Sequence, residues 1–294
     1  MRSLTKHGIS ALASVASRAA QSASLRRMIF NGIRLRRPEV ECFGRMDEIR
    51  FLAYCFLNRD RSRSQIFQDL WVSYELGEKQ GGFFVEFGAT NGVTNSNTWL
   101  LEKEYGWQGI LAEPNPFWHD ALAQNRASRK DRRCISSSSG KKVRFLVTNE
   151  VDPELSGVAE FASGDHFAAV RSAGREIEVE TVSLNQLLAD CNAPRRIDYM
   201  SIDTEGSEYD ILKSFDFSRY SIDLLSVEQN RKTEAAIQTL LTTRGYKRVF
   251  EEFSQWDGWY VHSERMISRR GTNLDRCFGA SPVQNVALVE KANG

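Results

Sequence analysis

The sequence predicts an α/β protein whose central sheet is mainly parallel and is covered by helices on both faces. Short, almost continuous apolar runs alternate along the chain with stretches of helical periodicity, a pattern typical of parallel strands that are buried on both sides. The last two strand-like runs, residues 246–253 and 257–262, are joined by a short turn and predict a closing antiparallel hairpin.

The first regular element is a predicted helix over residues 64–79, SQIFQDLWVSYELGEK. Its apolar side chains recur at helical spacing, and the glycine pair Gly81 and Gly82 is expected to end it. The predicted apolar stripe consists of Ile66, Phe67, Leu70, Trp71 and Tyr74.

Strands and helices alternate after this helix. The predicted strands of the sheet are residues 82–89, 109–114, 132–136, 198–203 and 223–229. The predicted helices are residues 96–105, 117–127, 183–191, 207–215 and 232–245, the last with Gly245 as its C-terminal cap.

The middle of the chain departs from this alternation. Residues 141–147 and 175–182 are predicted strands, but the polar residues 148–175 between them show no period. An insertion of this length is usually a functional loop or lid, or is disordered, and its role stays open.

Composition sets limits on the class of protein. The chain has 294 residues, 41% of them apolar, and a net charge of +1, which argues against nucleic acid as its main partner. Its five cysteines are widely spaced and are expected to be free thiols. No stretch approaches the roughly 20 consecutive apolar residues of a membrane span, and we expect a soluble globular protein.

The beginning of the chain is basic. Residues 1–37 contain no acidic residue, and weak helical periodicity places a few apolar side chains on one face. Such a segment fits a surface helix on an anionic membrane, an organelle-targeting sequence or a disordered tail. We expect a basic extension and linker over residues 1–63, an α/β domain over residues 64–262 and an irregular tail over residues 263–294.

A glycine-bearing turn follows the strand at residues 82–89 and predicts a nucleotide-like ligand. Dinucleotide sites use three glycines in G-x-G-x-x-G, whereas this turn has only Gly88 and Gly92. The carboxylate of Glu86 also disfavours a pyrophosphate and favours a cationic ligand. S-adenosylmethionine (SAM), which carries an ammonium and a sulfonium group, is therefore preferred to NAD.

Two further strands end in carboxylates. Glu113 lies at the end of the second strand, where dinucleotide-binding folds carry an acidic residue that binds ribose hydroxyls. The alternative interpretation is that Glu113 is an ordinary exposed glutamate at a strand end. Asp203 ends the strand at residues 198–203 and Glu205 follows in the turn, and neither carboxylate has a structural explanation. By contrast, Ser207 and Asp210 have the spacing of a capping box, which gives Asp210, and with it Glu208, a structural explanation.

These motifs together resemble the FkbM family of SAM-dependent methyltransferases, in its SQxxQD branch. The resemblance extends over about residues 64–262 and rests on SQIFQDLWV, FFVEFGATNGVTNSNTWLLEKEYGW, GILAEPNP, CISSSSGKKVRF, VETVSLNQLL and DYMSIDTEGSEYDIL. It implies the seven-stranded, Rossmann-like methyltransferase fold with an antiparallel last strand pair, and O-methylation of a hydroxyl, often on a sugar or a polyketide.

The resemblance also implies a cofactor site. Residues of the glycine turn would hold the methionine end of SAM, Glu113 and Pro114 would lie at the ribose, and Ser136 and Ser137 would lie near the adenine. The turn residues in question are Glu86, Gly88, Ala89, Thr90 and Gly92. Asp203 belongs to both the cofactor site and the catalytic site.

Methyl transfer to a hydroxyl requires activation of that hydroxyl, because a protonated aliphatic hydroxyl is a poor nucleophile. A carboxylate can take its proton, or a divalent cation can lower its pKa. Asp203, Glu205 and Glu228 are the candidate catalytic residues. Mg²⁺ bound by Asp203, Glu228 and Asn230 is a less favoured alternative, and a structural role for Glu228 is another.

Several other polar and aromatic residues have two interpretations each. His119 and His166 are candidate bases. His119 is expected to be a surface histidine instead, and no motif supports contact of His166, which lies in the insertion, with an acceptor. Gln65, Gln68 and Asp69 are either solvated or border the pocket for SAM or the acceptor. Trp256 and Trp259 either stack on a sugar ring or pack on the core.

The leading hypothesis is an enzyme that methylates a hydroxyl of a glycan or a small polyhydroxylated metabolite. The alternative is a non-catalytic module of the same fold that binds a membrane or a protein through its basic head. We expect a cytoplasmic protein with peripheral membrane contact through residues 1–37, and organellar targeting is a further alternative.

Overall fold

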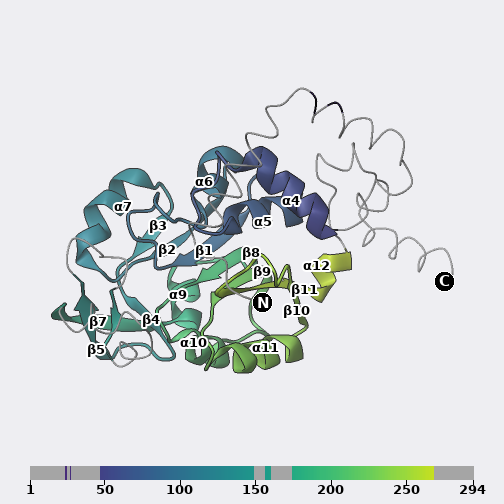
Figure 1. Cartoon of the computed structure of the whole chain (residues 1–294). Coiled ribbons are helices and arrows are strands. Elements are labelled where there is room, and N and C mark those ends of the chain that lie inside the picture. Colours follow the sequence, from purple (N-terminus) through teal and green to yellow (C-terminus); the bar gives the residue numbers. More distant parts are fainter. Residues whose placement is uncertain (1–23, 25–26, 28–46, 149–155, 160–173, 268–294) are drawn as a thin grey trace.

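The central element is a seven-stranded sheet, seen in a computed structural model that describes residues 24, 27, 47–148, 156–159 and 174–267 (Figure 1). The strand order is β10-β11-β9-β8-β1-β2-β3. The strands are β1 Phe83–Phe87, β2 Gln108–Ala112, β3 Arg129–Asp131, β8 Arg196–Ile202, β9 Ser221–Glu228, β10 Tyr246–Val249 and β11 Asp257–His262.

The strand directions confirm the predicted sheet. β1 pairs in parallel with both β2 and β8, and β2–β3 and β8–β9 are also parallel. β11 runs antiparallel to β9 and to β10. The seven strands and the closing antiparallel hairpin expected from the sequence are therefore present.

Helices cover both faces of the sheet (Figure 1). One face carries α4 Asp47–Asn58, α5 Gln68–Glu75, α6 Trp99–Tyr105 and α7 His119–Asn125, and the other carries α9 Leu184–Asp190, α10 Glu208–Ser214 and α11 Glu234–Thr243. Two short elements complete the described helices, the 3-10 turn η1 Pro116–Trp118 and α12 Ser263–Ile267. None of the described helices combines the length and apolar character that a membrane span needs.

Strand residues alternate between the two faces and build two cores. On β9, Leu224 packs under α4 and α5, whereas its neighbour Leu225 packs under α9–α11. The same alternation puts Phe84 and Val85 of β1 on opposite sides. Both faces are apolar, which explains why these strands appear in the sequence as nearly continuous apolar runs.

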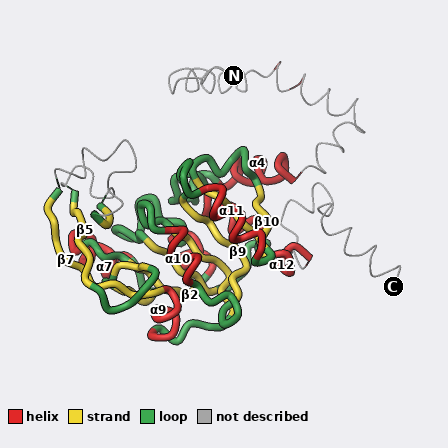
Figure 2. The backbone as a smooth tube through the Cα atoms, turned by 90° about the horizontal axis from the view of Figure 1, so that it is seen from below, coloured by secondary structure: helices red, strands yellow, loops and turns green. Residues whose placement is uncertain are grey.

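A smaller sheet lies at the end of the molecule away from α4 and α12 (Figure 2). Its order is β4-β7-β5-β6, with β4 Cys134–Ser136, β5 Lys142–Val147, β6 Gly157–Val158 and β7 Arg175–Ser183. The predicted strands at residues 141–147 and 175–182 correspond to β5 and β7, which pair antiparallel.

The strand predicted at residues 132–136 was wrongly assigned to the main sheet. The short strand β3 occupies that place, and β4 pairs with β7 of the small sheet instead. Between them Asp131 accepts a hydrogen bond from the backbone N–H of Arg133 at 2.9 Å and pairs with its guanidinium. This turn redirects the chain before Cys134, which packs with Phe145 and Val179 in a small core of its own.

The predicted helix over residues 64–79 is shorter than expected. α5 begins at Gln68, because the buried carboxylate of Asp69 accepts hydrogen bonds from Arg63 N, Ser62 Oγ and Ser64 Oγ and holds those residues in a turn. Phe67 has φ of +66° and is exposed, so it does not join the predicted stripe. The helix ends at Glu75, well before Gly81.

α4 lies upstream of the expected domain boundary. Phe51, Tyr54 and Cys55 on its inner face are buried in the same core as α5 and β11. The domain boundary at residue 64 stays a prediction. The packing of α4 shows that residues before this boundary contribute to the core of the domain. The three described cysteines, Cys55, Cys134 and Cys191, are free thiols.

Candidate active site

The carboxyl ends of β1, β2 and β8 meet at one edge of the sheet and carry Gly88, Glu113 and Asp203. Gly88 has φ of +66°, and a Cβ atom added to it would lie 2.8 Å from the carbonyl oxygen of Asp203. Only glycine fits this close approach of the two strand ends without movement. The structure thus brings together the glycine turn and the carboxylate that the sequence placed on separate strands.

Glu113 joins the turns that follow β1 and β2. Its buried carboxylate accepts hydrogen bonds from the backbone N–H of Thr90 at 2.8 Å and of Asn115 at 2.7 Å. Burial raises the pKa of Glu113 to about 7, although these two hydrogen bonds favour the charged form. A carboxylate has about four acceptor positions, so lone pairs remain for hydroxyl donors.

Ala89, Thr90 and Pro114 lie in the same two turns. Ala89 is buried and donates its backbone N–H to Ala112 O at 3.3 Å, while Thr90 has φ of +45°. Pro114 is half-buried directly after Glu113. The backbone here is shaped by hydrogen bonds between neighbouring strand ends, and the roles of these residues toward a cofactor stay predictions.

Glu86 has protein partners that the sequence argument did not foresee. Its buried carboxylate accepts hydrogen bonds from Asn97 N at 2.6 Å, from Thr98 Oγ1 at 2.5 Å and from Ser96 Oγ at 3.2 Å. The guanidinium of Arg126 lies 3.6 Å away and is itself fully buried. Burial raises the pKa of Glu86, and Arg126 opposes that rise. The carboxylate of Glu86 is therefore hydrogen-bonded and ion-paired within the protein, and its contact with a ligand stays a prediction.

Arg126 on the C-terminal side of α7 is the residue that sequence reasoning missed most clearly. It donates to Gly92 O at 3.1 Å and Thr98 Oγ1 at 2.9 Å, and pairs with Glu102 at 3.1 Å. A Cβ atom on Gly92 would lie 2.5 Å from Arg126 Cγ, so this glycine makes room for Arg126. No motif around residue 126 indicates these contacts, which arise only when α7 packs on the loop after β1.

A polar row crosses the sheet beneath this loop. Glu86, Ser201 and Ser226 are in register on β1, β8 and β9, and all three are buried. Asn97 Nδ2 donates to Ser201 Oγ at 2.9 Å, whereas Asn97 Oδ1 is buried and has no hydrogen-bond partner among the described residues. Asn97 is a second polar residue that the sequence analysis did not single out.

Three acidic side chains cluster one step further along the same face. Carboxylate oxygens of Asp203, Glu205 and Glu228 lie within 4.8 Å of one another. The charge of Asp203, followed by burial, raises the pKa of Glu228 well above its ordinary value. Protein atoms pack round Asp203 although its side chain is open to solvent, and this packing together with the charge of Glu205 raises its pKa as well. The structure therefore unites the three predicted catalytic residues.

A buried pair backs this acid cluster. Asp257 lies opposite Glu228 in the β9–β11 register, and Gln68 Nε2 donates to Asp257 Oδ2 at 3.0 Å. Burial raises the pKa of Asp257 to about 6. Gln68 is thus not simply solvated, and it ties α5 to the strand next to the cluster. Gln65 is exposed.

The predicted capping box at Ser207 and Asp210 is not formed. Ser207 Oγ donates to Thr204 Oγ1 at 2.8 Å, and Asp210 is exposed. The buried carboxylate of Glu208 holds the turn instead, accepting from Thr204 N at 3.0 Å and Gly206 N at 2.9 Å. The structural role predicted for Glu208 exists through these different contacts, because the turn after β8 folds back over the helix start.

The side-chain oxygen of Asn230 is hydrogen-bonded within its own turn, and its predicted role as a metal ligand stays a prediction. Its Oδ1 accepts hydrogen bonds from Lys232 N at 2.9 Å and Thr233 N at 3.2 Å in the following turn. Ser136 is half-buried and Ser137 exposed at the end of β4, in the small sheet rather than the main one. Their contact with an adenine stays a prediction.

The small sheet reaches the site through β6. Asn115 Nδ2 donates to Ser156 Oγ at 3.1 Å, and a Cβ atom on Gly157 would lie 3.2 Å from Glu205 Cβ. The described part of the predicted insertion therefore borders the acid cluster and the turn after β2. His166 and most of residues 148–175 lie outside the described residues.

The remaining aromatic and histidine predictions have mixed outcomes. His119 is half-buried, with Nε2 2.9 Å from Glu113 O, and burial lowers its pKa. Trp259 is fully buried and stacks on Trp71 at 5.1 Å between ring centroids, so it packs on the core. Trp256 is exposed.

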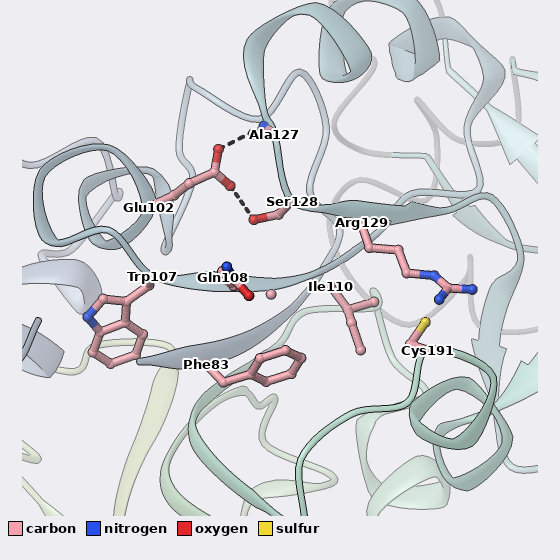
Figure 3. A pocket seen from close by; sticks show the side chains of 10 residues that line it. Phe83, Glu102, Trp107, Gln108, Ile110, Ala127, Ser128, Arg129 and Cys191 are labelled. Carbon is pink, nitrogen blue, oxygen red and sulfur yellow. Dashed lines mark hydrogen bonds between the residues drawn. The ribbon is translucent and has the colours of Figure 1, made fainter. Parts of the chain in front are cut away.

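A pocket of about 350 Å³ lies elsewhere, at the amino ends of the strands (Figure 3). Phe83, Gln108 and Arg129, the first residues of β1, β2 and β3, line it together with Trp107 and Cys191. The figure shows Arg129 and Cys191 side by side at one end of it. This pocket is at the opposite edge of the sheet from the acid cluster and is not the candidate active site.

Comparison with known proteins supplies a family. A protein-family model described as the methyltransferase FkbM domain matches residues 86–259 of the sequence. This range begins at Glu86 and includes Glu113, Asp203 and Glu228. Among curated proteins, none matches the sequence.

Two solved structures are similar to the chain at low identity. A precorrin-6y C5,15-methyltransferase from Geobacter metallireducens GS-15 is 12% identical, with a TM-score of 0.34, over 66% of this chain and 85% of that chain. A human methyltransferase 10 domain containing protein is 12% identical, with a TM-score of 0.36, over 72% of this chain and 94% of that chain. These scores are too low to add to what the strand order already establishes.

Proposed function

Because the chain belongs to the FkbM methyltransferase family, we propose that it uses SAM to methylate a hydroxyl group of a glycan or a small polyhydroxylated metabolite. The family match covers more than half of the 294 residues. The observation that carries the hydroxyl assignment is the cluster of Asp203, Glu205 and Glu228 beside the glycine turn. An aliphatic hydroxyl is a poor nucleophile unless a nearby group takes its proton.

The strand ends fit an adenosyl ligand. Gly88 lets the ends of β1 and β8 approach closely, because a Cβ atom there would lie 2.8 Å from Asp203 O. The buried carboxylate of Glu113 retains acceptor positions for two ribose hydroxyls. SAM supplies an activated methyl group, which leaves as the sulfur keeps the electron pair of the broken bond. The turn residues and Asp203 would hold its methionine end, and Ser136 and Ser137 its adenine.

The acid cluster has two roles in this proposal. Asp203, which is open to solvent at the strand end, accepts the hydroxyl proton as the oxygen attacks the methyl carbon. The charge of Glu205 raises the pKa of Asp203, because adjacent negative charges disfavour full ionisation, and the charge of Asp203 raises the pKa of Glu228 in the same way. Positioning the hydroxyl in line with the methyl group contributes much of the remaining rate.

Mg²⁺ is the second candidate for activating the hydroxyl. The oxygens of the cluster lie close enough together to share one divalent cation, and carboxylates are the ligands that Mg²⁺ prefers. A cation held there would lower the pKa of the acceptor hydroxyl, and Asp203 would then be a ligand instead of a base.

Calorimetry and label transfer test the proposal. We expect the full chain to bind SAM and not NAD, and to transfer a tritiated methyl group from SAM to hydroxyls in a panel of methyl glycosides and polyols. Asp203→Asn should change SAM affinity by less than about tenfold, equivalent to ~1.4 kcal/mol, while label transfer falls by about 100-fold or more. Addition of EDTA, followed by Mg²⁺, distinguishes the carboxylate base from the metal.

Asp210→Asn is the matched control, because Asp210 is an exposed acid on the helix that follows the same turn. It should leave binding and transfer unchanged. Absence of SAM binding would refute the cofactor, transfer only to amines or thiols would refute the hydroxyl acceptor, and normal transfer by Asp203→Asn would remove Asp203 from catalysis.

A further inference from the structure

Asn97 is a buried polar residue of which only half the side-chain amide is used. It lies in the loop between β1 and α6, and only 8% of the residue is exposed. Nδ2 donates a hydrogen bond to Ser201 Oγ at 2.9 Å. Oδ1 is the single buried side-chain oxygen without a hydrogen-bond partner in the described part of the chain.

The packing of the loop does not explain this amide. A buried polar atom without a partner destabilises a fold, and most such atoms inside proteins have a partner. Leucine is close to asparagine in shape and would not carry this cost. Ser201 does not depend on the amide either, because Ser226 Oγ also donates to Ser201 Oγ at 3.3 Å. A ligand that brings a hydrogen-bond donor would give Oδ1 its missing partner.

The carboxylate of Glu86, which lies beside Asn97, is already occupied by protein groups. It accepts hydrogen bonds from the backbone N–H of Asn97 at 2.6 Å and from Thr98 Oγ1 at 2.5 Å. Its negative charge is balanced by the fully buried guanidinium of Arg126, 3.6 Å away. These contacts fix the backbone at residue 97, and they leave the amide of Asn97 as the acceptor with spare capacity.

The surroundings of Asn97 favour a donor that is positively charged. Ser201, which holds the amide, is in register with Glu86 and lies two residues before Asp203. Residues two apart along an extended chain point to the same face of a sheet. The acid cluster around Asp203 is therefore on the same face as the amide, and its negative charge attracts a cation.

Oδ1 is covered by protein atoms in this structure, so a ligand group reaches it only when the amide turns outward. The exposed 8% of Asn97 places the residue at the border of the covered region. Turning the amide exchanges one hydrogen bond to Ser201, and Ser201 keeps its contact with Ser226.

We propose that Asn97 is a cofactor-binding residue whose Oδ1 accepts a hydrogen bond from the ammonium group of SAM. A hydrogen bond with a charged partner is among the stronger ones in proteins. Glu86 and Ser201 are positioning residues in this proposal, because they fix the backbone and the side chain of Asn97. The inference rests on the proposed function, since SAM is its ligand, and it adds Asn97 to the residues that would hold the methionine end.

Calorimetry with four ligands tests the role of Asn97 in the full chain. SAM, S-adenosylhomocysteine and decarboxylated SAM all carry the ammonium group, whereas methylthioadenosine lacks the whole amino-acid end. Asn97→Ala should weaken the binding of the first three by about tenfold or more and leave methylthioadenosine binding unchanged. The ratio of two affinities measured on one variant does not depend on the fraction that is folded, so a loss of stability cannot imitate this result.

Asn95→Gly is the matched control, because Asn95 is an exposed amide on the same loop and its φ of +57° suits glycine. It should bind all four ligands as the wild type does. Unchanged binding of SAM by Asn97→Ala would overturn the inference, and so would an equal loss for methylthioadenosine, because Asn97 would then only shape the loop.

The other ligands identify the group that Asn97 contacts. Normal binding of decarboxylated SAM by Asn97→Ala would show that the carboxylate is the partner, and normal binding of S-adenosylhomocysteine would show that the sulfonium is. Either result would overturn the ammonium contact while leaving the proposed function intact. Absence of SAM binding by the wild type would refute both the inference and the proposed function.

Discussion

Gly88 and Gly106 share a backbone φ of +66° in different surroundings. A Cβ atom on Gly88 would meet the Asp203 carbonyl at 2.8 Å, whereas one on Gly106 would meet nothing within 4 Å. The two positions therefore separate the cost of a left-handed backbone from the cost of closing the strand ends. In the sequence, Gly88 follows one predicted strand and Gly106 precedes the next. Only the packing of the folded chain distinguishes their surroundings.

Alanine at these glycines should have unequal effects. Gly106→Ala is expected to lower the free energy of unfolding by about 1–2 kcal/mol through backbone strain alone. Gly88→Ala adds the clash with Asp203 and should lower it by about 2–5 kcal/mol in total, with weaker SAM binding. Urea unfolding and calorimetry measure both quantities. Equal losses of stability would contradict the close approach at Gly88.

Glu113 should make stability depend on pH. Its pKa rises from about 4.5 to about 7 in the folded protein, so the native state holds a proton that the unfolded state releases between these pH values. This contribution to stability is present below about pH 4.5 and is lost as the pH rises to 7. Up to about 3 kcal/mol is involved, from about 1.4 kcal/mol for each pKa unit.

Glu113→Gln removes this titration. The free energy of unfolding of the variant, relative to the wild type, should increase by up to about 3 kcal/mol between pH 4.5 and pH 7.5. Urea unfolding at a series of pH values gives both curves. A difference that stays constant over this range would show that the carboxyl titrates normally in the folded state.

At the scale of elements, α4 carries opposite roles on its two sides. The Phe51 ring lies 4.7 Å from the Phe250 ring and 5.9 Å from that of Trp259, centroid to centroid, while Phe56 faces solvent. One helix therefore completes the core and presents an uncovered apolar surface. The sequence analysis expected only a linker here, because it placed the first regular element at residue 64.

The two phenylalanines of α4 should respond differently to truncation. Phe51→Ala is expected to cost about 3–5 kcal/mol of unfolding free energy, since it opens a cavity among buried aromatic rings. Phe56→Ala should cost less than about 1 kcal/mol, mainly the contact with Arg59. Chemical denaturation of both variants provides the comparison, and a similar loss in each would mean that α4 does not pack as described.

Elements with strong apolar runs were predictable, and those without were not. β1, β8 and β9 are buried on both faces, so their sequences are apolar almost throughout. β3 consists of the polar residues RKD and exists because β2 offers it an edge to pair with. The start of α5 was missed because it depends on side-chain bonds to Asp69 rather than on periodicity.

At the scale of the whole molecule, the mainly parallel sheet and the closing hairpin followed from the sequence, and Gly88, Glu113 and Asp203 could be placed at strand ends. The strand order did not follow, because the strand predicted at residues 132–136 belongs to the small sheet. The carboxyl ends of parallel strands lie together, so residues at strand ends can be placed without coordinates. Contacts between layers could not be placed in this way. Arg126 reaches Glu86 across 40 positions of sequence, and Gln68 reaches Asp257 across 189.

The pairing of β1 with β8 also has a consequence for the order of folding. The backbone N–H of Phe83 donates to Asp198 across 115 positions of sequence. Contacts of such long sequence separation form slowly, because the chain must lose the entropy of closing a long loop before these contacts stabilise it. During synthesis β1 and β2 emerge together, but β1 has no second neighbour until β8 follows. The close approach of Gly88 to Asp203 is therefore assembled late, after most of the chain up to Asp203 has left the ribosome.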